Sequence, residues 1–127
     1  MSRPFWKLTV RSEFCAAHAL RHYQGKCEHL HGHNYAVEVV VKGDTLSKDT
    51  ELLMDFGDLK TLLKHALEPL DHAYINDVPP FDVSNPSSEN IARYIWKQMA
   101  PALPANVAMH SVTVAEKGIQ SATYMEE

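Results

Sequence analysis

Apolar and polar residues alternate near both ends of the chain, and this period of two predicts β-strands. The first alternating segment runs from Phe5 to Phe14 and continues to His18, and the second covers His33 to Lys42. The polar stretch between them contains Gly25 and predicts a long loop rather than a tight hairpin. Alternation returns at the C-terminal end, where Val112 and Val114 share a face of one predicted strand, Lys117-Gly118 turns the chain, and Ile119 to Tyr124 form a closing strand.

Two helices are predicted between these strand pairs. The first begins near Asp55, a favourable N-cap residue, and Pro69 limits its end. The second opens in the segment NPSSEN, where Asn85 or Ser87 caps it, and Pro101 ends it. Their buried faces are predicted to be Leu59, Leu62, Leu63, Ala66, Leu67 and Leu70 in the first helix, and Ile91, Ala92, Ile95, Trp96 and Met99 in the second. The order ββααββ predicts an α+β fold, an antiparallel four-stranded sheet with both helices on one face.

Length and composition indicate one domain over residues 1–127, of which 45% are hydrophobic and 22% charged. The net charge of -4 provides no basic surface for nucleic acid, and no segment approaches the roughly 20 apolar residues of a membrane span. The N-terminus also lacks an apolar signal core, so we expect a cytoplasmic protein without nucleic-acid or membrane partners. Both cysteines are then expected to be thiols, with Cys15 in the core.

Three histidines are predicted to meet on the buried face of the sheet. His18 closes the first alternating segment, while His31 and His33 open the second. Residues two apart on a strand share a face, so His18 points inward with Phe14, and the other two point inward with Tyr35. Antiparallel pairing of the two strands would bring all three together at the end joined by the loop. Three imidazole nitrogens with an open fourth position are a typical donor set for catalytic zinc.

Spacing also indicates which histidines do not belong to this set. His29 alternates with His31 and His33, but three consecutive residues on one face span about 13 Å, too far for one ion about 2 Å from each nitrogen. We interpret four histidines as ordinary polar residues: His22, His29, His65 and His110. The alternative for the predicted ligands is that they are hydrogen-bonded or exposed and bind no metal.

Cys27 and the pair Asp71-His72 are candidates for proton transfer. Cys27 lies four residues before His31, in the loop that would pass over the metal, and a cation near a thiol lowers its pKa and makes it a usable base or nucleophile. Its alternative role is that of a small buried hydrophobe. The adjacent acid and imidazole could orient and protonate the thiol, although most such pairs lie on the surface.

Glu116 is predicted to point to the buried face with Val112 and Val114. A carboxylate in that position needs hydrogen-bond donors, and a ligand with an amidine-like or guanidine-like edge supplies two parallel ones. The alternative is that the strand has ended and Glu116 is solvated.

The motifs FCAAH, CEHLHGHNY, LLMDF, LDHAYIND, NPSSENIA and VAEK, taken in this order, resemble the 6-pyruvoyltetrahydropterin synthase family. That family includes the bacterial 6-carboxytetrahydropterin synthases of queuosine biosynthesis. The resemblance covers nearly the whole chain, and CxxxHGH is its most specific part. It implies the following roles: zinc ligands His18, His31 and His33, catalytic thiol Cys27, relay residues Asp71 and His72, pterin anchor Glu116, and pterin contacts Ser87 and Ser88.

The resemblance also implies an assembly and a substrate. The assembly is the tunnelling fold, in which three subunits close their sheets into a barrel, two trimers commonly stack, and active sites lie between subunits. The substrate is 7,8-dihydroneopterin triphosphate, for which Arg11, Arg21 and Lys26 are candidate phosphate ligands. We expect Zn²⁺ as cofactor, no redox cofactor, and 6-carboxytetrahydropterin, acetaldehyde and triphosphate as products.

Other activities stay open at this point. A 6-pyruvoyl product is one alternative within the family. Glu28 follows Cys27, so the chain also reads ExxHGH, the pattern of a branch that makes 6-hydroxymethyl-7,8-dihydropterin for folate, and dual activity is a further hypothesis. A non-catalytic pterin- or purine-binding protein is an alternative of another class. The presence of Cys27, Asp71 and His72 together disfavours it, because binding alone needs no proton relay. A metal-storage or sensor role is also disfavoured, because three dispersed ligands imply an open catalytic position on the metal.

Overall fold

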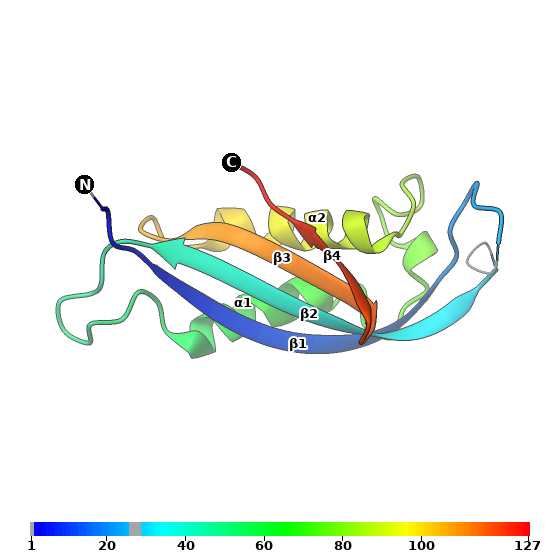
Figure 1. Ribbon diagram of the computed structural model, residues 1–127. Helices are drawn as coiled ribbons and strands as arrows, with labels where there is room; N and C mark the ends of the chain where they lie inside the picture. The colour runs from blue at the N-terminus through cyan, green and yellow to red at the C-terminus, as the bar shows by residue number, and fades with distance from the viewer. Residues whose placement is uncertain (1, 26–28) are drawn as a thin grey trace.

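The structure, a computed structural model, describes residues 2–25 and 29–127 and has the predicted element order (Figure 1). Among the described residues, the elements are β1 (Trp6–His18), β2 (His31–Gly43), α1 (Phe56–Leu67), α2 (Ser88–Met99), β3 (Ala108–Lys117) and β4 (Gln120–Tyr124), with single-turn 3₁₀ helices η2 (Ile75–Asp77) and η3 (Ala100–Ala102). The four strands form one sheet in the order β1-β2-β3-β4, and each neighbouring pair is antiparallel. The predicted α+β class and ββααββ order are therefore confirmed.

The pairing of β1 with β2 extends to the last residue of β1. Thirteen residues of each strand are in register, from Trp6 opposite Gly43 to His18 opposite His31. The second strand therefore begins two residues before the predicted start at His33, because His31 continues the ladder with His18. The sheet thus carries both of these histidines on regular backbone at its end.

The core lies between one face of the sheet and both helices, as the alternation predicted (Figure 1). Fully buried strand residues on this face are Tyr35, Val37, Val39, Val41, Val112 and Val114, and those of the helices are Leu59, Leu63, Ile91, Ile95 and Met99. The prediction that Cys15 belongs to the core is wrong, because it lies between Phe14 and Ala16 on β1 and so points to the opposite, exposed face. Trp6, at the start of β1, is 45% exposed.

Both helix starts are capped by side chains. Asp55 accepts a hydrogen bond from the backbone N–H of Gly57, and Ser87 accepts one from that of Asn90. Of the two predicted caps for α2, Ser87 is therefore the one used, which leaves the Asn85 side chain for other contacts. Helix α1 ends at Leu67, ahead of Pro69, as predicted.

No helix within residues 2–25 and 29–127 is long and apolar enough to cross a membrane. The cytoplasmic location and the trimeric barrel stay predictions.

The end of β2 offers a packing test with a matched control. A Cβ added at Gly43 would lie 2.5 Å from the backbone oxygen of Asn106 and 2.5 Å from Leu53 Cδ1, whereas one added at Gly118 would meet no atom within 4 Å. We expect Gly43→Ala to lower the free energy of unfolding by about 1–3 kcal/mol, because a backbone oxygen must move. Gly118→Ala should stay close to the wild type in the same denaturant titration. Equal stability of the two variants would contradict the packing described at this end of the sheet.

Candidate active site and metal centre

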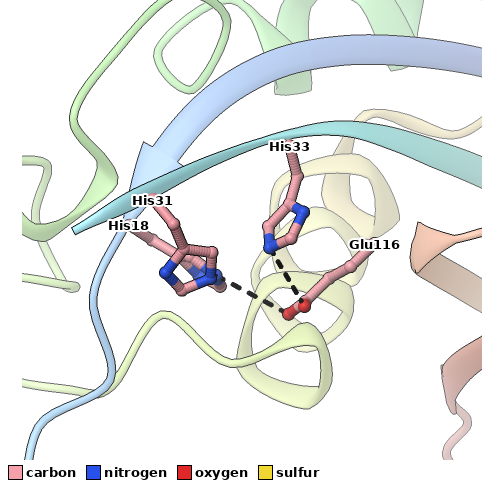
Figure 2. A group of neighbouring side chains, drawn as sticks. All are labelled: His18, His31, His33 and Glu116. Carbon is pink, nitrogen blue, oxygen red and sulfur yellow. Dashed lines mark hydrogen bonds and ion pairs between the residues drawn. The ribbon is translucent and has the colours of Figure 1, made fainter. Parts of the chain in front are cut away.

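Four side chains converge at the end of the sheet where β1 ends, β2 begins and β3 ends. They are His18, His31, His33 and Glu116, and Figure 2 shows their polar atoms pointing toward one another. One candidate ligand atom from each lies within 4.8 Å of all the others. The structure therefore brings together the three predicted metal-binding histidines and adds a carboxylate to them.

The distances within the cluster suit a single tetrahedral ion. The Nε2 atoms of His18 and His31 are 2.9 Å apart. Glu116 Oε1 lies 3.7 Å from His18 Nε2, and Glu116 Oε2 lies 3.4 Å from His33 Nε2. Ligands about 2.0 Å from a tetrahedral zinc ion are about 3.3 Å from one another, so the measured separations bracket that value. The donor set, three imidazoles and one carboxylate, also fits zinc.

Hydrogen bonds orient two of the imidazole rings. His18 Nδ1 donates to the carbonyl oxygen of Pro86 at 2.7 Å, and His31 Nδ1 donates to that of His29, also at 2.7 Å. Each contact holds the proton on Nδ1 and leaves the Nε2 lone pair directed at the cluster. His33 Nε2 is buried and makes no hydrogen bond with the described residues, which is the state expected of an atom that needs a metal.

Burial keeps two of the histidines neutral. Desolvation lowers the pKa of His18, and this effect outweighs the opposing influences of the Pro86 carbonyl and of Glu116. Desolvation likewise lowers the pKa of His33, although Glu116 again opposes the shift. Neutral imidazole is the form that binds metal ions, so near neutral pH both rings are ready to act as ligands.

Glu116 lies within β3 and its side chain is only 16% exposed, so the alternative of a solvated residue beyond the strand is wrong. The β3–β4 register shifts between Val114 and Lys117, and this irregularity falls at Glu116, as bulges near functional sites often do. Ser88 Oγ donates to Glu116 Oε1 at 3.0 Å. Glu116 therefore lies next to the three histidines, for which the sequence predicted an open fourth coordination position.

Asp71 and His72 lie beside the outer edge of β1, whose last residues they contact, rather than in the cluster. Asp71 Oδ1 accepts a hydrogen bond from the backbone N–H of Cys15 at 3.1 Å, and the backbone N–H of His72 donates to the Cys15 carbonyl. The His72 side chain is 80% exposed, with its Nδ1 3.0 Å from Asp71 Oδ1. His72 also has a positive φ of 58°, an uncommon conformation for this residue type. The two other predicted catalytic residues, Cys27 and Glu28, lie outside the described residues.

The candidate phosphate ligands that the structure describes have protein partners. The Arg21 guanidinium donates to backbone carbonyls, and Arg11 forms a 3.0 Å ion pair with Glu38 on the exposed face of the sheet. Lys26 lies outside the described residues. The sequence did not predict that the Pro86 carbonyl accepts a hydrogen bond from His18, because every residue has a backbone carbonyl and the residue type does not show which one is used.

Comparisons with known proteins agree on one family. The family model described as 6-pyruvoyl tetrahydropterin synthase matches residues 7–127. A 6-carboxy-5,6,7,8-tetrahydropterin synthase from Synechocystis sp. is 37% identical over 124 residues, covering 94% of this chain and 92% of that protein. The structure of the Caenorhabditis elegans 6-pyruvoyl tetrahydropterin synthase superposes with a TM-score of 0.85 at 27% identity and full coverage of both chains.

A third relative has solved variants at a catalytic residue of its own. The 6-pyruvoyltetrahydropterin synthase of Plasmodium vivax superposes with a TM-score of 0.77 at 25% identity, covering 98% of this chain and 99% of that one. Its solved variants replace a catalytic glutamate with cysteine or alanine.

Metal content tests the cluster directly. We expect His33→Ala to reduce the zinc bound from about one ion per chain to near zero, because it removes one of three imidazole ligands. His65→Ala, at an exposed position on α1, should retain the metal. Elemental analysis after dialysis measures both. Full zinc retention in His33→Ala would show that the metal binds elsewhere.

Proposed function

The chain belongs to the 6-pyruvoyl tetrahydropterin synthase family of lyases, and we propose that it is a zinc-dependent 6-carboxytetrahydropterin synthase. Its substrate is then 7,8-dihydroneopterin triphosphate, and its place is in queuosine biosynthesis. The main support for this proposal is that candidate ligand atoms of four side chains lie within 4.8 Å of one another, those of His18, His31, His33 and Glu116. The similarity to the Synechocystis 6-carboxy enzyme over 94% of the chain favours that product over the 6-pyruvoyl one.

A pocket beside the cluster suits the pterin ring. Its volume is about 250 Å³, and its lining includes Leu20, Ser88, Glu116 and Ser121. Glu116 stands between this pocket and the histidines, so a small rotation of its side chain turns the carboxylate toward a ring with an amidine-like edge. Ser88 already holds one carboxylate oxygen and can follow this rotation. In this arrangement the substrate's hydroxylated side chain points toward the histidine cluster.

Proton transfer is assigned to the protein side chains. A zinc ion held by His18, His31 and His33 would supply Lewis-acid polarisation of the substrate's side-chain oxygens, which would acidify the adjacent C–H and O–H bonds. The Cys27 thiolate accepts a proton from the activated side chain, and His72, paired with Asp71, exchanges protons with the thiol. Triphosphate leaves with the electron pair of its C–O bond, one water adds to the side-chain carbon next to the ring, and cleavage of the adjacent C–C bond releases acetaldehyde. Two electrons pass from the side chain into the dihydropterin ring, which becomes the tetrahydropterin, so no external oxidant or reductant is needed.

The position of Asp71 and His72 favours active sites shared between copies of the chain. Within the described part of one chain they lie along the β1 edge, outside the four-residue cluster. The sheet order leaves β1 and β4 as its two edges. Pairing of β1 with β4 of the next copy would continue the sheet and carry His72 toward the neighbour's site. Three such pairings close the trimeric barrel of the proposed tunnelling fold.

A second candidate activity uses Glu28. Cys27 and Glu28 are adjacent, so this chain has a glutamate as well as a thiol before HGH. The Plasmodium vivax relative, which has a catalytic glutamate, supports testing whether Glu28 makes 6-hydroxymethyl-7,8-dihydropterin.

Product analysis decides between these activities. Zinc-loaded protein is incubated with 7,8-dihydroneopterin triphosphate, and the pterins are identified by mass spectrometry. We expect 6-carboxytetrahydropterin from the wild type and its loss in Cys27→Ala, because the thiolate base is removed. A hydroxymethyl product that survives in Cys27→Ala but disappears in Glu28→Ala would assign that reaction to Glu28.

The opposite outcomes are equally informative. Dual activity is excluded if Cys27→Ala makes no hydroxymethyl product and Glu28→Ala leaves the product distribution unchanged. Zinc binding without any turnover by the wild type would favour a non-catalytic pterin-binding protein.

Shared sites are tested by complementation between two inactive variants. His33→Ala disables the metal cluster, and His72→Ala disables the relay. Random co-assembly of equal amounts should restore about a quarter of the wild-type activity, because one site in four then receives both intact halves from different chains. Co-expression with two affinity tags isolates the mixed oligomers. No recovery in verified mixed oligomers would place both residues of a working site on the same chain.

A further inference from the structure

The chain that follows His18 is tied to the segment that carries Pro86. Beyond the end of β1, Ala19 and Arg21 each form a two-way hydrogen-bonded pair with an asparagine side chain, contributed by Asn76 and Asn85. These residues lie 57 to 64 positions apart in the sequence. We call this set of contacts the asparagine clasp.

Each asparagine substitutes for a strand partner. The backbone N–H of Ala19 donates to Asn76 Oδ1 at 2.9 Å, and Asn76 Nδ2 donates back to the Ala19 carbonyl at 2.8 Å. The backbone N–H of Arg21 donates to Asn85 Oδ1 at 2.7 Å, and Asn85 Nδ2 donates back to the Arg21 carbonyl at 2.8 Å. Two alternate residues beyond β1 are therefore paired on both backbone groups.

The Arg21 side chain reinforces the clasp. Its guanidinium donates to the carbonyl oxygens of Phe81 at 2.7 Å, Ser84 at 3.0 Å and Asn76 at 3.4 Å. Three carbonyls of one irregular segment are thus held by one planar group, a geometry that the single ammonium of lysine does not reproduce. These contacts use both terminal nitrogens of the guanidinium.

The clasp closes a ring of contacts around a metal ligand. Asn85 directly precedes Pro86, whose carbonyl accepts the Nδ1 proton of His18. His18 in turn lies three residues before Arg21, the partner of Asn85. The clasp thus fixes the acceptor of the His18 ring on one side and the backbone of His18 on the other.

We propose that Asn85, Asn76 and Arg21 are positioning residues for the metal centre, which hold the His18 ring with its Nε2 directed at the ion. This inference rests on the proposed zinc site and deepens it. Groups that orient metal ligands through hydrogen bonds typically change metal affinity about 10–100-fold when removed. Arg21 accordingly serves the metal centre and not the triphosphate.

Zinc affinity, measured without substrate by competition with a chromophoric chelator, tests this proposal. Asn85→Ala is expected to weaken zinc binding about 10–100-fold and to alter the visible absorption of the Co²⁺-substituted protein. Arg21→Lys, which keeps the charge but loses the planar fork, should act in the same direction. If Asn85→Ala fails to fold, the zinc affinity of Arg21→Lys alone tests the positioning role.

Asn106→Ala is the matched control. The Asn106 side-chain amide likewise donates to two backbone carbonyls, those of Thr45 and Leu53, each at 3.3 Å, but away from the cluster. We expect this variant to keep the wild-type zinc affinity.

Three outcomes would overturn the positioning role. The first is wild-type zinc affinity in both clasp variants, and the second is an equal loss of zinc affinity in Asn106→Ala. The third is normal zinc affinity with a raised KM in Arg21→Lys, which would show that Arg21 binds the triphosphate. Absence of zinc binding by the wild-type chain would instead overturn the proposed function together with this inference.

Discussion

The antiparallel register of β1 and β2 is the constraint on which the site depends. It sets His18 directly opposite His31, and it sets Phe14 opposite Tyr35, whose stacked rings are 4.7 Å apart between centroids. A slip of one residue would turn the buried face of one strand to solvent and separate the histidines at the same time. The apolar alternation that forms the core therefore also positions the metal ligands, so stability and function specify the same register.

The cluster is unfavourable for the isolated chain. Desolvation lowers the pKa values of His18 and His33, and the Glu116 carboxylate lies beside these rings, where Ser88 donates a hydrogen bond to it. An apolar set of side chains would pack here at lower cost. Such a cluster persists because the surrounding backbone holds it: β2 carries His31 and His33, and the asparagine clasp holds the chain beyond His18. Regular sheet supplies the ligands, and irregular segments orient them.

The fold and the three histidines could be predicted because they follow from local periodicity. The period of two assigned the buried face of each strand, and the helical spacing of leucines assigned that of α1. Cys15 was misplaced although the same parity puts it on the exposed face, next to Phe14. Periodicity could not predict the hydrogen bonds that Asn76, Asn85 and Pro86 make with the end of β1. These bonds join segments that are far apart in the sequence, and they use amide and carbonyl groups that every protein contains. Parity also placed Glu116 on the buried face with Val112 and Val114, but its distance from the histidines depends on how β2 pairs with β3, which periodicity does not encode.

X-ray absorption at the zinc K-edge of the zinc-loaded wild-type protein identifies the atoms that bind the ion. We predict that nitrogen and oxygen atoms bind the ion at about 2.0 Å, with the multiple-scattering pattern of three imidazole rings. A sulfur atom at about 2.3 Å would make Cys27 a metal ligand instead of the base. Such a signal, or fewer than three imidazoles, would contradict the site built on His18, His31 and His33.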